Sequence, residues 1–433
     1  MADTREPFNG LLHGVYQIAL LVSFIPGLPK YMQYSTFFVL VWIAHYMITK
    51  MTTGNPAVDL ALGSAILTQL MNPVDNFFFT DPDSLNDVYH HQNQKGKITT
   101  APLKERIKWA FHLFINARGI GWAHESRCTP PRVLPATTHS AFVLRQLKRA
   151  VFCMALECAA YTTNASNPYM TYTVGRLTTA PFIWRALGVA AFASAGYARI
   201  NWMHCLLSAA VVGVGLSLPE RWPNLFGSPL QAWSVARFWR FTWHHLLRKP
   251  LRAFATVFTS VLFKHPRQPF NPKQKIPAAS HSFSETARNL IWACTAFLMS
   301  GLIHIGGEVM LTGHISYGAF TFFALQPIAI IIETLVAFLW HSITRQPQPK
   351  ASYKSPASDN GNADSGTEGA SVSCFVGSEV EQAGAGQLWM RYAGYVWVAL
   401  WFVWSLAFMI DPMIPTSMFV DARVDLRTKE WYL

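Results

Sequence analysis

The stretch T-A-R-N-L-I-W-A-C-T-A-F-L-M-S-G-L-I-H-I-G-G-E-V-M-L, residues Thr286 to Leu311, decides the fold class. It is apolar along nearly all of its length, and as a helix it is long enough to cross a hydrocarbon core of roughly 30 Å. Further apolar runs recur on both sides of it. Because only helices or closed barrels satisfy the backbone inside a bilayer, the sequence predicts an all-α, multi-pass integral membrane protein.

The composition supports this fold class. The chain has 433 residues, of which 51% are hydrophobic and 13% are charged. That charge density is about half of the roughly 25% that is usual for a soluble domain. We therefore predict a single membrane domain over residues 1–433, although the length alone would permit two or three soluble domains.

The formal net charge of +12 raises the question of whether the protein binds nucleic acid. The Lys and Arg residues lie in short segments between apolar runs and form no continuous patch, so we predict cytosolic loop ends and no nucleic-acid partner. The same Lys and Arg side chains would also attract the phosphates of a thioester cofactor. The six cysteines have no paired spacing, which predicts neither a disulfide scaffold nor a zinc site.

The N-terminal part of the chain alternates apolar runs with a basic region. Its predicted spans are Leu11–Pro29, Tyr34–Thr49 and Val58–Met71. The following region, Asn72–Arg149, is rich in proline, lysine and arginine, so we expect it on the cytosolic face. Within it, Leu103–Leu113 has the pattern of an amphipathic helix that lies in the membrane interface.

A second basic region, Pro219–Glu285, is also predicted to be cytosolic, so an even number of spans must separate it from the first. Two spans in Pro181–Leu218, broken near Gly196 to Asn201, meet this condition. The short run Ala150–Tyr161 is then non-spanning.

The remaining spans complete a count of roughly eight and leave the C-terminus lumenal. They are Thr286–Leu311, Ile315–Trp340 and Leu388–Ile410. Between the last two, residues 345–386 have the composition of a disordered cytosolic linker.

His304 lies well inside the apolar run Thr286–Leu311. A titratable side chain at such a position costs free energy unless it is satisfied, so it is a functional candidate. Ser300, His304 and Glu308 are spaced i, i+4 and i+8, which places them near one helix face. We expect Glu308 to accept a hydrogen bond from the imidazole and to leave the other ring nitrogen free. A buried histidine that only links helices is the alternative.

A second group of histidines lies in the aromatic, basic segment R-F-W-R-F-T-W-H-H at Arg237 to His245. An interfacial helix with snorkelling arginines explains its tryptophan and arginine content, but not His244 and His245. A zinc site with His90 and His91 lacks the usual ligand spacing, and we predict no metal.

Four segments of the chain resemble the motifs of a known family. Phe238 to His245 resembles the F-W-x-x-x-W-H motif of the wax-synthase-like branch of the membrane-bound O-acyltransferases, and S-G-L-I-H at Ser300–His304 resembles that branch's S-G-x-x-H motif. R-G-I-G-W at Arg118–Trp122 and F-F-x-L-Q-P-I-x-I-x-x-E at Phe322–Glu333 are weaker matches. The four motifs span most of the membrane core in the family's order.

The resemblance implies an enzyme that moves an acyl group from acyl-coenzyme A, a co-substrate and not a tightly bound cofactor, to a hydroxyl. It gives His304 the catalytic role and makes His244 the second catalytic residue. We predict supporting roles for Trp243 and His245 of the aromatic segment, and for Ser300 and Glu308 on the same helix face as His304. Many members have Glu directly after the catalytic His, where this chain has Ile305. The compact fungal members of this branch are the most similar to this chain, and they acetylate terpenoid and meroterpenoid alcohols.

The expected chemistry follows from these residues. A histidine with a pKa of about 6.5 is suited to take the proton of an alcohol that attacks a thioester carbonyl. The chain has no G-x-S-x-G motif, so direct transfer is expected. We predict that the coenzyme's phosphates meet Arg237, Arg240, Arg248 and Lys249, and that the hydrophobic alcohol enters from the bilayer of the endoplasmic reticulum.

Three alternatives remain open. A long-chain wax synthase would use a fatty alcohol. A transporter would use His304 and Glu333 as a proton relay and should show a repeated span pattern, which is not found. An inactive membrane scaffold would tolerate the loss of His304.

Overall fold

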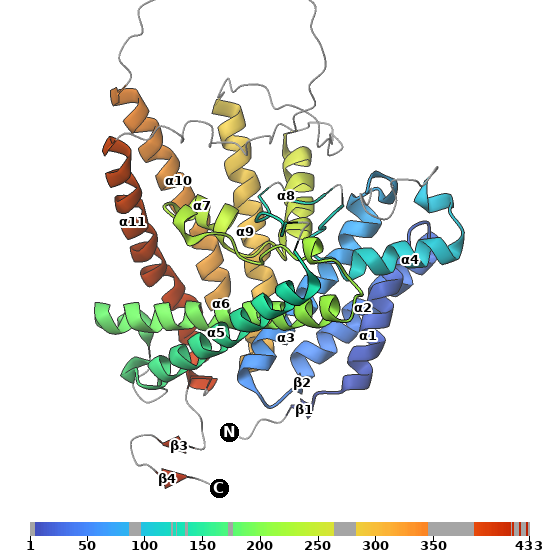
Figure 1. Cartoon of the computed structure of the whole chain (residues 1–433), viewed down its shortest axis with the longest axis horizontal. Coiled ribbons are helices and arrows are strands. Elements are labelled where there is room, and N and C mark those ends of the chain that lie inside the picture. The colour runs from blue at the N-terminus through green and yellow to red at the C-terminus, as the bar shows by residue number, and fades with distance from the viewer. Residues whose placement is uncertain are drawn as a thin grey trace, which may run out of the picture.

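The computed structural model is helical throughout its core (Figure 1). It describes residues 5–85, 97–122, 124–126, 128–134, 137–171, 176–263, 283–344, 385–416, 418–419, 424–425 and 430–431. Two short strand pairs accompany the helices: β1 (Glu6–Pro7) pairs in parallel with β2 (Met51–Thr52), and β3 (Val424–Asp425) pairs antiparallel with β4 (Glu430–Trp431). The all-α class is confirmed, because these pairs add no layer of sheet.

Four helices form the N-terminal part: α1 (Gly10–Ser23), α2 (Lys30–Lys50), α3 (Pro56–Val74) and α4 (Leu103–Phe114). The predicted first span is wrong in length, since α1 has 14 residues and ends before Pro26. At 1.5 Å per residue this helix is about 21 Å long, shorter than a bilayer core. The predicted helix at Leu103–Leu113 is confirmed as α4.

The middle of the chain differs most from the prediction. Residues 182–213 form one continuous helix, α6 (Phe182–Gly213), where we expected two spans with a break. No proline lies between its ends, and the backbone at Gly196 has open space around it, so the glycine is accommodated at a cost of about 1 kcal/mol. The run Ala150–Tyr161 is likewise part of a longer helix, α5 (His139–Ala165).

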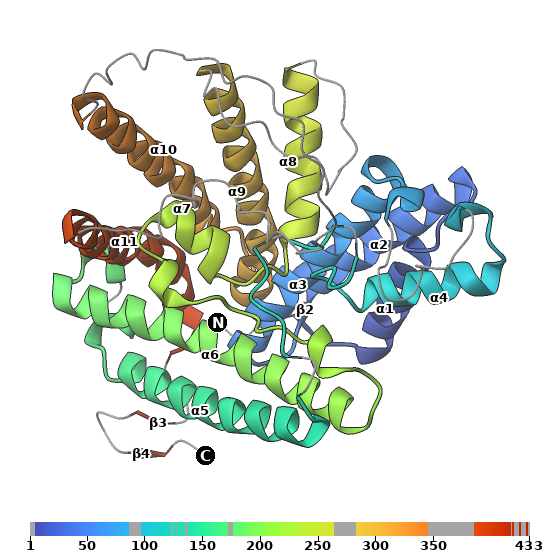
Figure 2. The ribbon, with the colours of Figure 1, turned by 45° about the horizontal axis from the view of Figure 1, so that its top comes forward.

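Figures 1 and 2 show α5 and α6 side by side and crosswise to the helices of the C-terminal half. Those helices are α8 (Arg248–Leu262), α9 (Phe283–Thr312), α10 (Gly318–Thr344) and α11 (Ala385–Ile410), preceded by a single turn, α7 (Val235–Arg237). Short helical turns connect the elements. Of these, η1 (Asp75–Phe79) and η8 (Phe238–Thr242) are π-helical, and the 3₁₀ turns are η2 (Pro82–Ser84), η3 (Ile98–Thr100), η4 (Pro168–Met170), η5 (Leu177–Thr179), η6 (Pro219–Arg221), η7 (Pro229–Gln231) and η9 (Asp411–Thr416).

Three helical stretches in the described residues are long and apolar enough to cross a membrane: Thr286–Thr312, Gly318–Trp340 and Leu388–Thr416. They confirm the last three predicted spans. The predicted number of roughly eight spans is not reached when spans are judged by helix length and mean hydropathy. Helix α1 is too short, and the other N-terminal and central helices carry more polar residues. The predicted linker lies outside the described residues, except that Ala385 and Gly386 begin α11.

The helix that carries His304 is held against α3 by glycines. A Cβ at Gly306 would lie 2.6 Å from the Leu67 side chain and 2.7 Å from the Gly63 carbonyl oxygen, and a Cβ at Gly307 would overlap the Leu60 carbonyl oxygen. Small residues of this kind let two helix backbones approach closely. The α3–α9 crossing thus fixes the position of the S-G-L-I-H turn.

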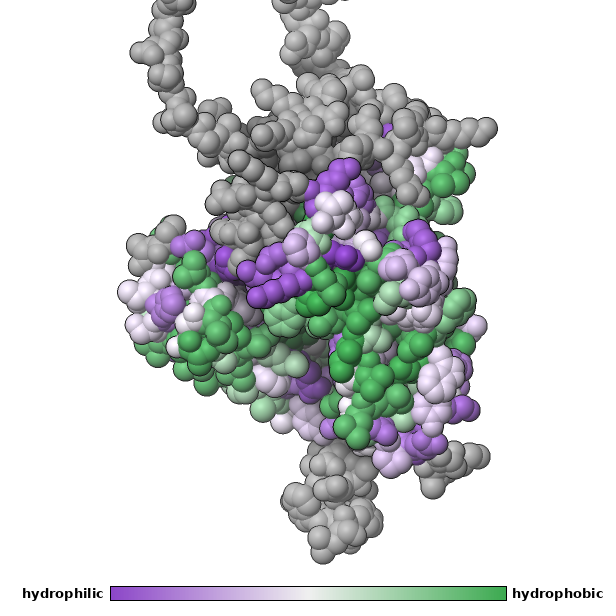
Figure 3. Space-filling view, turned by 90° about the vertical axis from the view of Figure 1, so that its right-hand side faces the viewer, coloured by the Kyte–Doolittle hydropathy of each residue, from purple (hydrophilic) through white to green (hydrophobic). Residues whose placement is uncertain are grey.

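Apolar side chains gather on the outer face of the N-terminal helices, with hydrophilic residues at their edges (Figure 3). On α1 the side chains of Leu11, Val15 and Ile18 are exposed at the helical spacing, and on α2 Phe38 and Trp42 are exposed in the same way. Contiguous apolar surface of this extent is typical of contact with lipid and not with water. The face therefore suits a bilayer, as the multi-pass class requires.

Candidate active site

His304 lies on α9, half-buried, with a defined tautomer. Its Nδ1 is 2.7 Å from the carbonyl oxygen of Ser300, one turn earlier. A carbonyl oxygen only accepts hydrogen bonds, so Nδ1 carries the proton and Nε2 has the free lone pair. The ring also packs on Phe323 of α10, with centroids 4.5 Å apart. An imidazole held in this way is oriented to accept a proton at Nε2.

Glu308 does not hold His304, so the predicted hydrogen bond between them is wrong. The Glu308 carboxylate is fully buried, and its Oε1 accepts the backbone N–H of Ala319 at the start of α10. It thereby satisfies one of the free N–H groups of that helix terminus, where a negative charge is favourable. The backbone carbonyl of Ser300 performs the orienting function that we had assigned to this carboxylate.

The aromatic segment folds as a π-helical turn. In η8 the N–H of Trp243 donates to the Phe238 carbonyl, 2.9 Å away, which closes the wider ring of a π-helix. Such turns are frequent at functional sites. Trp239 points into the helical bundle, where its indole ring meets Phe297 of α9 at 5.5 Å and Phe323 of α10 at 5.8 Å. Phe323 therefore lies between the two motifs and contacts both.

His244 follows this turn and lies near His304. Its ring is 5.3 Å from Trp243 and 5.7 Å from Phe226, and its Nδ1 is buried without a partner among the described residues. Burial, together with the nearby His304 and His245, lowers the pKa of His244 to about 3. The imidazole is therefore neutral near pH 7, with one N–H to donate.

His245 has a different environment from His244. Its Nε2 lies 3.0 Å from the Arg240 carbonyl, so this nitrogen carries the proton and donates back into the π-helical turn. Burial and the neighbouring Arg248 lower its pKa to about 4. We infer that His245 stabilises the π-helical turn. His244 instead packs against the rings of Trp243 and Phe226, near His304.

The four predicted phosphate-binding cations divide into two groups. Arg237 and Arg240 flank the ring of Phe241, with guanidinium carbons 4.9 and 5.2 Å from its centroid. Arg248 lies 3.3 Å from His245 Nε2, and Lys249 forms an ion pair with the buried Asp75. The charge of Lys249 is thus balanced within the protein.

The two weaker sequence motifs position the aromatic segment. From one of them, Gln326 is fully buried and accepts the indole N–H of Trp239 at 3.3 Å. Glu333 of the same motif accepts the N–H groups of Val235 and Ala236 at 2.5 and 3.1 Å, and also the indole N–H of Trp397 at 2.9 Å. Sequence reasoning found these residues as motif members but did not predict that they anchor α7 and η8.

The R-G-I-G-W motif supports the same region from the other side. Arg118 donates to the carbonyls of Pro223 and Asn224, both at 3.0 Å. These residues directly precede Leu225 and Phe226, and the Phe226 ring contacts His244. Gly119 and Gly121 have φ of 63° and 83°, a conformation that favours glycine. The motif therefore holds the loop that carries Phe226, whose ring packs against His244.

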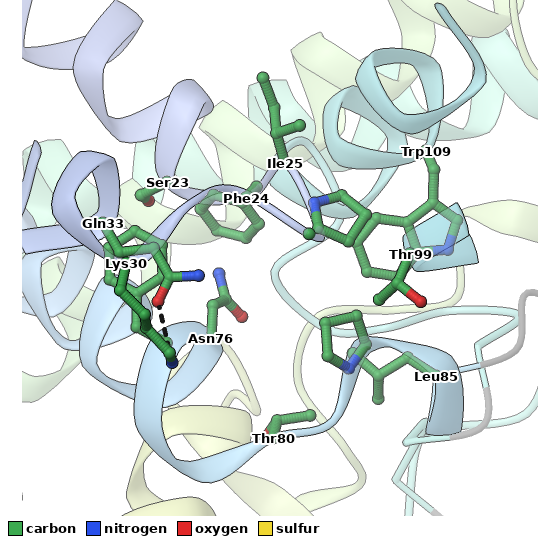
Figure 4. Close-up of a pocket in the computed structure, with 14 residues that line it drawn as sticks. Ser23, Phe24, Ile25, Lys30, Gln33, Asn76, Thr80, Leu85, Thr99 and Trp109 are labelled. Atoms are coloured by element: carbon green, nitrogen blue, oxygen red, sulfur yellow. Dashed lines mark hydrogen bonds between the residues drawn. The ribbon is translucent and has the colours of Figure 1, made fainter. Parts of the chain in front are cut away.

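No cluster of three metal-binding side chains occurs among the described residues, and His90 and His91 lie outside them. A cavity of about 170 Å³ opens between the α1–α2 turn, η1 and α4 (Figure 4). Its lining includes Phe24, Asn76 and Trp109 but no residue of α9 or of the aromatic segment. This cavity is therefore separate from the two histidines.

The chain is similar to known proteins in the region that contains the two histidines. The model of the membrane bound O-acyl transferase family matches residues 222–325, the segment that contains both histidine motifs. The chain is 25% identical to the acetyltransferase eriL of Hericium erinaceus over 96% of this chain and 94% of that protein. It is 28% identical to the acetyltransferase ple2 of Rhodocybe pseudopiperita, over 70% and 74% of the two chains.

A third relative carries another name. The O-Mevalon transferase macI of Penicillium terrestre is 27% identical over 57% of this chain and 56% of its own length. No solved structure shows significant similarity to the chain. The segment that carries both histidine motifs is thus similar to the membrane bound O-acyl transferase family, and this match together with the fungal relatives supports an O-acyltransferase.

Proposed function

We propose that this enzyme transfers an acetyl group from acetyl-coenzyme A to a hydroxyl of a hydrophobic terpenoid or meroterpenoid, with His304 as the general base. The observation that carries the proposal is the hydrogen bond from His304 Nδ1 to Ser300, because it leaves Nε2 free to take the proton. Two fungal relatives are named acetyltransferases, which supports acetyl as the transferred group.

The reaction proceeds by direct attack. As His304 Nε2 takes the proton of the alcohol, the oxygen forms a bond to the thioester carbonyl and negative charge develops on the carbonyl oxygen. Collapse of this intermediate breaks the carbon–sulfur bond, and the imidazolium returns its proton to the leaving thiolate. A general base of this kind contributes typically about 10²–10⁴-fold.

His244 is proposed to stabilise the oxyanion. It is neutral near pH 7, and its Nδ1 has no partner among the described residues, so in the tautomer that is protonated at Nδ1 this N–H can donate to the developing charge. A donor in a dry site costs little reorganisation when the charge forms. Trp243 and Phe226 pack beside its ring and supply the apolar surroundings.

The structure argues against a proton relay through Glu333. Its carboxylate accepts three N–H groups, from Val235, Ala236 and Trp397. These bonds hold the side chain at the start of α7. Glu333 therefore acts as a fixed anchor and not as a mobile proton carrier.

The proposal is tested with microsomes that contain the wild type or His304→Ala. Labelled acetyl-coenzyme A and a panel of terpenoid alcohols are supplied, and labelled esters are measured. Ester from the wild type alone supports the reaction and the base. Product only with a long-chain donor and a fatty alcohol would indicate wax synthesis, and product only with a larger polar acyl donor would indicate a reaction like that named for macI.

The cell compartment belongs to this proposal as well. The apolar helices and the family make the chain an integral membrane protein. We propose the endoplasmic reticulum, with the coenzyme approaching from the cytosolic side, and fractionation of cells that express the tagged protein tests this placement.

A further inference from the structure

Three guanidinium groups lie near the place where the segment before α7, η8 and α11 meet. Arg237 and Arg240 lie over the same ring, Phe241, and Arg237 also lies 4.4 Å from the centroid of Trp233. Stacking between two aromatic rings holds the Arg237 fork in a fixed plane. Its Nε and Nη2 donate to Gln231, at 3.2 and 3.4 Å.

The third guanidinium comes from α11, far away in the sequence. A Cβ at Gly394 would overlap the Trp233 carbonyl oxygen, and the Tyr395 hydroxyl donates to the Leu230 carbonyl at 2.5 Å. These contacts place α11 directly on the segment before α7. Arg391 is three residues before Gly394, on the same helix face.

The electrostatics agree with this placement. Burial lowers the pKa of Arg237, and the positive charges of Arg240 and Arg391 lower it further. Arg237 is therefore close enough to both Arg240 and Arg391 to be repelled by their charges. Such an arrangement costs free energy unless an anion offsets it.

No carboxylate offsets it within the part of the chain that the structure describes. Elsewhere in the fold the part-buried Lys249 is paired with Asp75. The carboxylate of Glu333 is already bonded to the N–H groups at the start of α7, and Arg240 Nε is buried without a hydrogen-bond partner among the described residues. The cluster of Arg237, Arg240 and Arg391 is thus left with uncompensated positive charge.

We propose that Arg237, Arg240 and Arg391 together bind a phosphate group of the acyl-coenzyme A, with Arg391 as the residue that completes the subsite. The inference rests on the proposed function. Planar guanidinium forks match phosphate oxygens in pairs of charge-assisted hydrogen bonds. Lys249 is excluded from the subsite because Asp75 holds it.

The position relative to the histidines is consistent with such a ligand. Arg240 precedes His244 by four residues, which separates their Cα atoms by at most about 14 Å. The pantetheine arm of coenzyme A is a long, flexible chain between its phosphates and its thioester. A phosphate held by the arginine cluster can therefore coexist with a thioester beside His304.

Donor analogues test the inference. Acetyl-coenzyme A, acetyl-dephospho-coenzyme A and S-acetylpantetheine carry progressively fewer phosphates on the same thioester. For Arg391→Gln we expect the KM for acetyl-coenzyme A to rise about 10- to 100-fold, with kcat within about twofold and with the KM for S-acetylpantetheine unchanged. Arg391→Lys keeps the positive charge but lacks the planar guanidinium fork, so its KM for acetyl-coenzyme A is expected to lie between those of the wild type and Arg391→Gln.

A matched control uses Arg288, an exposed arginine near the start of α9. Arg288→Gln removes one positive charge from a neighbouring helix and is expected to leave the KM values unchanged. Equal losses with all three donors for Arg391→Gln would show a structural role and overturn the subsite. An unchanged KM for acetyl-coenzyme A would overturn it as well.

Two further measurements separate the failure of the subsite from the failure of the proposed function. Binding of 3′,5′-ADP to the purified protein is expected to weaken at least about tenfold in Arg391→Gln, whether or not the acceptor alcohol is known. If that binding depends on Arg391 while no acyl-coenzyme A is turned over, the proposed function fails and the subsite stands. If Arg391→Gln instead changes only the dependence of activity on phosphatidylserine in vesicles, the phosphate belongs to lipid, and the coenzyme is overturned as the ligand.

Discussion

His304 donates its Nδ1 proton to the carbonyl oxygen of Ser300, 2.7 Å away and one helical turn earlier. The acceptor is a backbone atom of the same helix. The tautomer is therefore set by the helix itself and requires no neighbouring carboxylate. This relationship explains why Glu308 is free to cap α10.

The first prediction distinguishes the role of the Ser300 backbone carbonyl from that of its side-chain hydroxyl. His304→Ala is expected to lower kcat by about 10²–10⁴-fold, because no group then takes the alcohol proton. Ser300→Ala retains the carbonyl and is expected to keep kcat within about threefold. Ester formation by both variants, at matched amounts of folded protein, is the measurement. A loss in Ser300→Ala as large as that in His304→Ala would assign the chemistry to the hydroxyl.

The second prediction concerns His244. His244→Ala is expected to lower kcat by about 10²–10³-fold with little change in the KM for the acyl donor, as for the loss of an oxyanion donor. His245→Asn provides the comparison, since an amide N–H can still donate to the Arg240 carbonyl. We expect a smaller loss of kcat there, together with lower thermal stability. The reverse order of the two effects would assign the oxyanion role to His245.

The third prediction concerns acid stability. Burial and the charges of Lys249 and Arg252 lower the pKa of His124 to about 3, well below its usual 6.5. Between these values the unfolded chain binds a proton that the folded chain does not. The folded state is therefore stabilised above pH 6.5 relative to lower pH, and it loses stability as the pH falls toward 3.

His124→Asn removes this titration. The melting temperature of the wild type in detergent is expected to fall between about pH 7 and pH 5, and the fall is expected to be smaller in His124→Asn. His139→Asn is the control, because His139 is an exposed residue at the start of α5. The same pH profile in wild type and His124→Asn would show that other groups govern acid stability.

The fourth prediction tests the anchor function of Glu333. Glu333→Gln keeps an acceptor oxygen for the Val235 N–H but loses the charge and one acceptor. We expect a loss of about 1.5–3 kcal/mol in stability, as for hydrogen bonds to a charged group, with ester formation retained at low temperature. If Glu333→Gln stays fully folded but forms no ester, the carboxylate has a chemical role, and the anchor interpretation is wrong.

The amino-acid sequence predicts the elements that have strong local signals. The long apolar runs before the C-terminus predict α9, α10 and α11, and the spacing of polar and apolar residues predicts α4. The two histidine motifs alone make His304 and His244 the candidates for catalysis. Local pattern is sufficient in these cases because each signal lies within one segment.

The features that the sequence did not predict depend on contacts between distant segments. Nothing near Glu308 in the sequence indicates that it would meet Ala319 and not His304. Arg391 joins Arg237 only because Gly394 lets α11 lie against the segment before α7. The break expected near Gly196 is absent because a glycine weakens a helix only modestly, whereas a proline would have interrupted it.

The fifth prediction uses two helix glycines with opposite surroundings. A Cβ at Gly306 would lie 2.6 Å from Leu67 and 2.7 Å from the Gly63 carbonyl oxygen, so Gly306→Ala forces α3 and α9 apart. We expect a loss of about 1–3 kcal/mol in stability and a reduced kcat, since the turn that carries His304 shifts with its helix. Gly196→Ala on α6 meets nothing within 4 Å and is expected to raise stability by up to about 1 kcal/mol with kcat unchanged.

Thermal unfolding in detergent and ester formation, measured on both variants side by side, check this pair. The same substitution is made in the interior of a helix in each case, so a general effect of added Cβ atoms would act on both alike. Only the close approach of α3 distinguishes them. If Gly306→Ala is as stable and as active as the wild type, the two helices are not held at the distance that the structure shows, and the S-G-L-I-H turn must be positioned by α10 through Phe323.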